Sequence, residues 1–134
     1  MAIVLAGLLA ALFSFLANSL ALKSYGPMAA VGAIPLLEEV AKTVPAFLLG
    51  APILMTHGVF GLIEAWHDFY SRRGRAGISP LLSVAGHLAF GGLTQFFYSF
   101  TGVLGYGIAA AAAAHCLWNL GIPLIIPRGG NQDS

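Results

Sequence analysis

One stretch of this chain places three charged side chains inside an otherwise apolar run. From Pro35 to Pro45 the sequence reads PLLEEVAKTVP, which contains Glu38, Glu39 and Lys42. A charge at bilayer depth costs about 2.5–3.5 kcal/mol on insertion scales, so such groups usually face a bundle interior or a wet cavity, either paired or functional. The stretch therefore predicts a functional site inside a bundle of helices.

The composition excludes an ordinary soluble domain. The chain has 134 residues, of which 58% are hydrophobic and 8% are charged, whereas globular proteins carry roughly 25% charged residues. A chain of this length predicts one membrane-embedded domain over residues 1–134. A net charge of +1 without a basic stripe predicts no nucleic-acid partner. The single cysteine, Cys116, excludes an internal disulfide and a cysteine-based zinc site.

Hydrophobic length divides the chain into transmembrane spans. A spanning helix needs ~20 mostly apolar residues, and the first run lacks the basic n-region of a signal peptide, so we expect it to be retained as a helix. Ser79 and Pro80 are expected to be the N-cap and first-turn proline of the fourth span. The pattern predicts an all-α polytopic membrane bundle of about five transmembrane helices, namely Ala2–Leu22, Met28–Leu49, Ile53–Tyr70, Pro80–Phe100 and Val103–Ile126.

The basic residues predict how these spans are oriented. If the spans alternate, all basic side chains except Lys42 fall in loops on one face of the membrane, and the turns on the opposite face have none. By the positive-inside rule that face is cytoplasmic. We therefore expect a multi-pass protein of the cell membrane with an extracytoplasmic N-terminus and a cytoplasmic C-terminus. The loop residues that support this orientation are Lys23, Arg72, Arg73, Arg75 and Arg128.

Ionisable side chains occur in four of the five spans, and the first span has none. Counting helical rise from the cytoplasmic ends, Glu38 and His115 lie roughly 16 Å deep, and Glu64 and His87 lie roughly 10 Å deep. A shift of about 2–4 residues in the span boundaries brings all four side chains to one level. This coincidence of depth predicts one site built from four helices.

The chemistry of these groups matches metal-assisted hydrolysis. Two imidazoles and one carboxylate form a catalytic zinc set with an open position for water, which gives Glu64, His87 and His115 as the expected ligands. Glu38 or Glu39 is expected to act as general base. The two point about 100° apart on a helix, so only one can be the base. We favour Glu38, although Lys42, four residues on, could pair with Glu38 instead.

Several of these polar residues also have a purely structural interpretation. Glu38 and Lys42 could neutralise each other, His87 could form an interhelical hydrogen bond, and Asn119 could support packing. His57 is expected to lie at the membrane interface near the extracytoplasmic turn at residues 50–52. His67 and Asp68 are expected at the interface near the loop that carries Arg72, Arg73 and Arg75, here called the arginine loop. Pro35 and Pro45 bracket the carboxylates and are expected to loosen the backbone hydrogen bonds around them.

Four short motifs resemble a known family of membrane proteins. Glu38-Glu39-Val40-Ala41-Lys42 resembles the EExxK motif of PrsW-type intramembrane proteases, which are related to the CAAX-processing and bacteriocin-processing (CPBP, or Abi) membrane proteases. Phe60, four residues before Glu64, looks like the second PrsW motif. His87-Leu88-Ala89-Phe90 resembles the third, and His115-Cys116-Leu117-Trp118-Asn119 looks like the terminal HxxWN. The motifs occur in order within residues 35–120.

The resemblance implies an intramembrane endopeptidase that acts on a membrane protein or peptide in the lipid bilayer. Glu38 or Glu39 would activate water. Glu64, His87 and His115 would hold zinc or polarise the carbonyl, and Asn119 would assist at the oxyanion. In the CAAX-processing relatives, a glutamate-activated water has been proposed without a required zinc. The chain is also short for the family.

Two functions of other classes are compatible with the same residues. Chains of buried Glu and His also serve as proton relays, so a non-enzymatic proton- or cation-handling membrane protein is the main alternative. A substrate-binding or immunity-type module without turnover is the other. The intact set of acidic and imidazole side chains argues against this last possibility.

Overall fold

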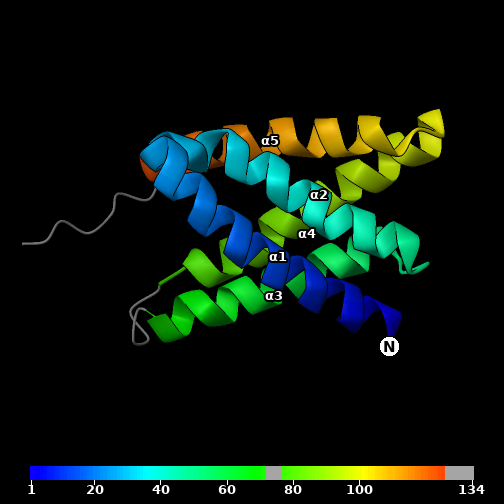
Figure 1. The fold of residues 1–134 in the computed structure, drawn as a ribbon, viewed down its shortest axis with the longest axis horizontal. Coiled ribbons are helices and arrows are strands. Elements are labelled where there is room, and N and C mark those ends of the chain that lie inside the picture. Colours follow the sequence, from blue (N-terminus) through cyan, green and yellow to red (C-terminus); the bar gives the residue numbers. More distant parts are fainter. Residues whose placement is uncertain (72–76, 126–134) are drawn as a thin grey trace, which may run out of the picture.

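The computed structural model describes residues 1–71 and 77–125, and all its regular elements are helices (Figure 1). The prediction of an all-α protein is therefore confirmed, and four helices begin and end within a few residues of the predicted spans. Part of the arginine loop, Ile126 and Arg128 lie outside the described residues. The elements are α1 (Ala2–Tyr25), the 3₁₀ helix η1 (Gly26–Val31), α2 (Ala33–Leu48), α3 (Ile53–Ser71), α4 (Ser79–Thr101) and α5 (Leu104–Ile125).

The second predicted span is wrong in its first part. The chain forms the 3₁₀ helix η1 and then passes Gly32, whose φ is −135°, before α2 begins at Ala33. Pro35 consequently lies in the first turn of α2, where the backbone N–H groups have no intrahelical partner. Pro35 therefore removes no helical hydrogen bond, contrary to our expectation that it loosens the backbone hydrogen bonds around the carboxylates. Pro45 alone of the two lies in the helix interior.

The start of α4 also differs in detail from the prediction. Ser79 is the first helical residue and not the N-cap, which is Ile78. The Ser79 hydroxyl instead donates to Asp68 Oδ2 over 3.1 Å and joins α4 to α3. Pro80 lies in the first turn as expected. α4 ends at Thr101, and the left-handed φ of 72° at the following Gly102 lets the Gly102 N–H donate to the Tyr98 carbonyl at 2.8 Å.

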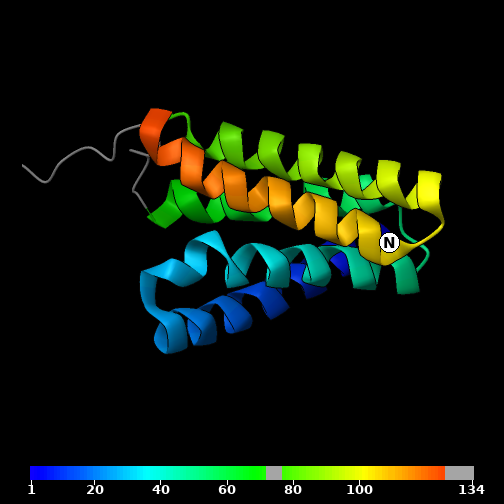
Figure 2. The same ribbon diagram turned by 90° about the horizontal axis from the view of Figure 1, so that it is seen from above.

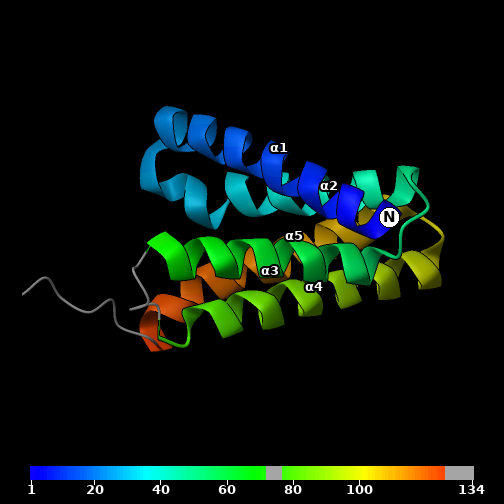
Figure 3. The ribbon, with the colours of Figure 1, turned by 90° about the horizontal axis from the view of Figure 1, so that it is seen from below.

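Successive long helices run in alternating directions. The connection from α1 to α2, the end of α3, the start of α4 and the end of α5 lie at one end of the bundle, and the α2–α3 and α4–α5 turns lie at the other (Figure 1). The helical pair α1 and α2 forms one layer against α3, α4 and α5, with α4 farthest from that pair (Figures 2 and 3). Lys23 lies near the end where the arginine loop was predicted.

Small residues set where α1 meets α3. A Cβ atom added to Gly7 would lie only 2.4 Å from Val59 Cγ1, so the two helices are in close contact at this point. From there toward their C-terminal ends, α1 and α3 separate (Figure 1). The crossing at Gly7 therefore holds one end of the pair together while the other end opens.

One helix of the described chain is long and apolar enough to cross a membrane. It runs from Ala2 to Val31 through α1 and η1, with a mean hydropathy of 2.2 in its apolar window. Small residues of α1 face the bundle, and its large apolar side chains are exposed. This distribution supports membrane association. Exposed side chains on α1 include Leu5, Leu8, Leu12, Phe13, Phe15, Leu16 and Leu20.

Candidate functional site

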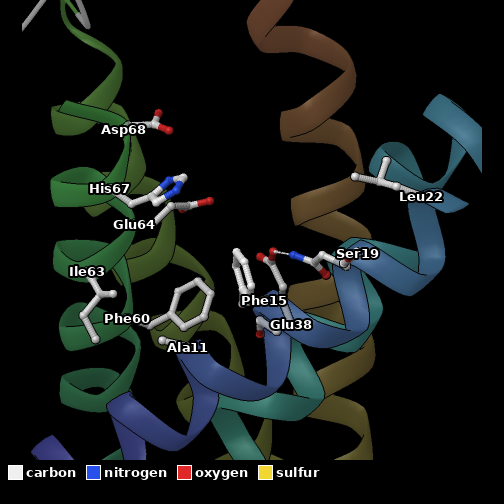
Figure 4. Close-up of a pocket in the computed structure, with 12 residues that line it drawn as sticks. Ala11, Phe15, Ser19, Leu22, Glu38, Phe60, Ile63, Glu64, His67 and Asp68 are labelled. Atoms are coloured by element: carbon white, nitrogen blue, oxygen red, sulfur yellow. Dashed lines mark hydrogen bonds between the residues drawn. The ribbon is translucent and has the colours of Figure 1, made fainter. Parts of the chain in front are cut away.

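A cavity of about 570 Å³ lies between the diverging parts of α1 and α3, with one side chain from α2 (Figure 4). We call it the cleft. Its α1 wall carries Ala11, Ser14, Phe15, Asn18, Ser19 and Leu22, and its α3 wall carries Phe60, Ile63, Glu64, His67 and Asp68. Glu38 is the contribution of α2. The predicted site residues Glu38 and Glu64 thus share one cavity.

Glu38 is held at the cleft by the N-terminal helix. Asn18 Nδ2 donates to Glu38 Oε1 over 2.6 Å, and the Glu38 residue is only 5% exposed (Figure 4). Its other oxygen, Oε2, lies 3.9 Å from His115 Nε2, which is too long for a direct hydrogen bond. One carboxylate oxygen is therefore fixed by an amide, and the other faces an imidazole nitrogen across a small gap.

Glu39 and Lys42 form a buried ion pair behind the cleft. Neither side chain is exposed, and Lys42 Nζ donates to Glu39 Oε1 over 2.5 Å. His115 Nδ1 contacts the same oxygen at 2.9 Å. Lys42 Nζ also lies 4.8 Å from the centre of the Phe60 ring, a cation–π distance. Lys42 thus pairs with Glu39 and not with Glu38, the alternative partner that the four-residue spacing left open.

His87 connects this buried pair to Glu64. Lys42 Nζ lies 2.9 Å from His87 Nδ1, and His87 Nε2 lies 2.5 Å from Glu64 Oε2. An ammonium group can only donate hydrogen bonds, so His87 Nδ1 accepts from Lys42. His87 Nε2 then carries the proton that is donated to Glu64. Ser83 Oγ donates to the same oxygen over 2.7 Å. Glu64 is fixed by two donors, although its side chain remains 41% exposed.

His115 has the opposite tautomer. A carboxylate can only accept, so the contact with Glu39 assigns the proton to His115 Nδ1. The lone pair of Nε2 then faces Glu38. The His115 ring stacks on Phe90, with centroids 4.5 Å apart, and this contact fixes its orientation. The two histidines therefore differ at Nε2. His87 donates its Nε2–H to Glu64, whereas the Nε2 lone pair of His115 points toward Glu38.

His57 belongs to the same buried cluster as Glu39, Lys42, His87 and His115 (the polar cluster), and its predicted interfacial position is wrong. The residue is 0% exposed, with Nε2 3.2 Å from Thr43 Oγ1 and Nδ1 3.6 Å from Glu39 Oε2. α4 covers it, because a Cβ on Gly91 would lie 2.8 Å from His57 Cβ. The helical spacing of His57, Phe60 and Glu64 places all three on one face of α3. That periodicity was the signal that could have identified it.

The contribution of α1 was also missed. Asn18 is uncharged, so a search for ionisable groups in the first span could not find it. It lies four residues after Ser14, and the two therefore share a helix face. Two polar side chains on one face of an apolar helix were the available signal.

Asn119 does not face Glu38. Its Nδ2 donates to the Ala30 carbonyl over 2.9 Å and joins α5 to η1. The Asn119 amide, which was expected to assist the reaction, thus makes a packing contact.

His67 and Asp68 lie on the C-terminal part of α3 and line the outer part of the cleft (Figure 4). His67 Nε2 lies 3.4 Å from Ser71 Oγ.

The three expected zinc ligands do not form one donor set in this arrangement. Glu64 and His87 are in contact, whereas His115 bonds to Glu39. The His87 Nδ1 lone pair faces the Lys42 ammonium, so neither of its ring nitrogens is open to a cation. In residues 1–71 and 77–125, no three His, Cys, Asp or Glu side chains are placed to hold a metal ion. The donors as arranged do not fit the predicted zinc site.

Comparison with protein-family models, with curated proteins and with solved structures finds no match. The resemblance to PrsW-type proteases therefore rests on the four motifs.

Proposed function

We propose that this chain is a polytopic intramembrane endopeptidase in which Glu38 activates water to hydrolyse a peptide bond of a membrane protein or peptide. The observation that carries the proposal is the division of labour between the adjacent glutamates. Glu39 is fully buried and bonded to Lys42 and His115, whereas Glu38 lines the cleft. Glu38 is therefore the one of the pair that a substrate could reach. The resemblance of the motifs supports the same class of reaction.

The surface of the bundle supports an embedded position for more than α1. Large apolar side chains are exposed on all five α-helices, an arrangement that is unfavourable in water and favourable in lipid. In the described part of the chain, the buried acidic and lysine side chains are Glu38, Glu39 and Lys42, which lie inside the bundle and away from its apolar surface. Examples of exposed side chains beyond α1 are Leu36, Phe47, Leu62, Trp66, Leu81, Phe96, Tyr106 and Leu117.

The geometry gives Glu38 a defined role in the reaction. Asn18 occupies Oε1, so Oε2 is the oxygen that accepts a proton from water. The His115 Nε2 lone pair, 3.9 Å from Oε2, can accept the second hydrogen of that water and orient it. The water oxygen bonds to the carbonyl carbon, the C–N bond breaks, and the proton held by Glu38 passes to the leaving nitrogen.

Glu64 and His87 would orient the substrate beside this base. Because Ser83 and His87 both donate to Glu64 Oε2, the carboxylate is fixed on the cleft wall as an acceptor. It can accept a hydrogen bond from a backbone N–H of a bound peptide. Lys42 and Glu39 lie behind the cleft and hold both histidines in their tautomers.

The variants Glu38→Gln and Glu39→Gln test this assignment, with Lys23→Gln as an exposed control. The purified protein in detergent is mixed with casein carrying a self-quenching dye, because unfolded casein can bind in extended form. General-base catalysis is worth about 10²–10⁴ in rate, so Glu38→Gln should lose at least about 10²-fold in kcat. Unchanged cleavage by a folded Glu38→Gln protein would refute the proposal.

A non-enzymatic proton pathway is the second candidate, and one observation favours it. A continuous series of polar contacts runs from Glu64 through His87, Lys42 and Glu39. It continues from Glu39 toward His57, whose Nδ1 lies 3.6 Å away. Proton flux into liposomes by the wild type without any casein cleavage would favour this function. Cleavage without flux would favour the protease.

A further inference from the structure

Among the described residues, the predicted site residues offer no free donor for the oxygen of the scissile carbonyl. Hydrolysis places negative charge on that oxygen, and a preorganised hydrogen bond to it lowers the barrier. The Asn119 amide donates to Ala30, and the ring N–H groups of His87 and His115 donate to carboxylates. In the described part of the chain, the predicted site residues therefore provide no free N–H to the cleft by these assignments.

Ser14 on α1 provides the missing kind of group. It lines the cleft, its residue is 2% exposed, and its Oγ has no hydrogen-bond partner among the described residues. A helical serine commonly bonds back to the carbonyl four residues earlier, and a buried hydroxyl without any partner is unfavourable. Such exceptions are uncommon and call for an explanation. A ligand in the cleft would satisfy this hydroxyl.

The position of Ser14 relative to the base fits this role. Ser14 and Asn18 are four residues apart on one face of α1, a spacing of about 5–6 Å between Cβ atoms. Asn18 Nδ2 bonds directly to Glu38. Asn18 Oδ1 is buried and also lacks a partner within the described chain. The α1 wall therefore presents one donor and one acceptor next to the proposed base, which are the two groups that a peptide unit requires.

We propose that α1 forms half of the active site, with Ser14 donating to the scissile carbonyl oxygen and Asn18 positioning Glu38. This inference rests on the proposed function and specifies its substrate as an extended segment lying between α1 and α3. Apolar side chains of that segment would contact Phe15, Phe60 and Ile63 in the cleft. Asn18 Oδ1 would accept a backbone N–H of the same segment.

Kinetics with the dye-labelled casein test the role of Ser14. Removing one oxyanion donor lowers kcat by about 10²–10³-fold, so Ser14→Ala should lower kcat by about 10²-fold with little change in KM. Ser14→Thr keeps the hydroxyl and should retain most of the activity. Ser24→Ala is the control, because Ser24 is exposed on the same helix. Unchanged kcat in Ser14→Ala would overturn the assignment.

The role of Asn18 as a positioning residue predicts a non-additive effect. Asn18→Ala should lower kcat in the wild type but cause no further loss of kcat in Glu38→Gln, because its effect on kcat acts through that carboxylate, whereas loss of the Oδ1 contact should raise KM in both backgrounds. An amide with only a structural role would lower the melting temperature and the rate in both backgrounds.

A protection experiment separates this inference from the proposed function. In a Cys116→Ala and Glu38→Gln background, Ser14→Cys provides the only thiol, since the sequence has a single cysteine. Unlabelled casein should slow its alkylation in a saturable manner and leave the exposed control Leu16→Cys unaffected. Protection without cleavage by wild type would refute the protease function but keep α1 as a binding wall. Absence of protection would overturn the inference, whether or not wild type cleaves casein.

Discussion

Lys42 is the residue that decides how the two adjacent glutamates differ. Its ammonium is fully buried and contacts Glu39 and His87, so the charge of Glu39 is compensated inside the protein. The sequence predicted that Glu38, Glu64, His87 and His115 come together. It did not predict which of the two adjacent glutamates pairs with Lys42. Spacings of three and four residues both bring side chains together on a helix. Only the packing of α2 against its neighbours distinguishes them.

We predict that Lys42→Met destabilises the fold strongly. Removing one partner of a buried ion pair leaves an uncompensated charge and costs about 3–5 kcal/mol. Chemical unfolding in detergent measures the loss, with Lys23→Met as the exposed control. The double variant Lys42→Met with Glu39→Gln should recover part of the stability, because no buried charge then remains on that pair. Equal stability of the Lys42 and Lys23 variants would contradict the role assigned to this lysine.

Metal analysis tests the absence of a fit for zinc at His87. Because Lys42 holds the His87 Nδ1 lone pair and Glu64 accepts from Nε2, we expect casein cleavage to survive chelator treatment. Purified protein should likewise contain far less than one equivalent of zinc. Stoichiometric zinc that is lost in His87→Ala and His115→Ala would contradict this expectation. That outcome would restore the zinc set predicted from the sequence.

His57 shows why depth counting misplaced a residue. It lies in the first turns of α3, and counting along the chain therefore assigned it to the interface. In the structure, this part of α3 is covered by α4 and faces α2, where Glu39 and Thr43 meet the imidazole. Distance along a helix gives depth but not coverage by neighbours. Coverage requires the tertiary packing.

At the level of elements, adjacent glycines in α4 provide a matched test of the α3–α4 contact. A Cβ on Gly91 would lie 2.8 Å from His57 Cβ and 3.2 Å from Leu54 Cα, whereas Gly92 has nothing within 4 Å. Gly91→Ala should therefore cost about 1–3 kcal/mol through overpacking. Gly92→Ala should stabilise the helix by about 0.5–1 kcal/mol.

Chemical unfolding of both glycine variants measures the two signs. Casein cleavage should also fall in Gly91→Ala, because a displaced His57 no longer faces Glu39. If both substitutions stabilise the protein equally, α3 and α4 do not approach each other as described.

The break between η1 and α2 shows what an element prediction can miss. Hydrophobicity is continuous from Met28 to Leu49, so the sequence predicted one helix there. Gly32 interrupts it with a backbone conformation outside the α region. Cys116 and Asn119 of α5 both contact carbonyls of this segment. Gly32 O still accepts from Leu36 N at 3.4 Å, whereas Asn119 satisfies the Ala30 carbonyl, which a continuous helix would have paired internally.

At the scale of the whole molecule, the helix arrangement predicts that the two ends of the bundle lie on opposite sides of a membrane. Lys23 lies near the end of α1, and Val103 lies in the α4–α5 turn at the other end of the bundle (Figure 1). By the positive-inside rule, we expect Lys23 to be on the cytoplasmic side. In a Cys116→Ala background, an impermeant maleimide should label Val103→Cys on intact cells and Lys23→Cys only after permeabilisation. Equal labelling of both thiols on intact cells would contradict a membrane-spanning bundle of this orientation.

The central claim is that Glu38 activates a water molecule that becomes part of the product. The most direct measurement is the mass of casein fragments formed in heavy-oxygen water by the wild type and by Glu38→Gln. The wild type should give fragments whose new C-terminal carboxylate carries one heavy oxygen, and Glu38→Gln should give none above background. Equal fragment yields from both proteins, or wild-type fragments without heavy oxygen, would contradict the claim.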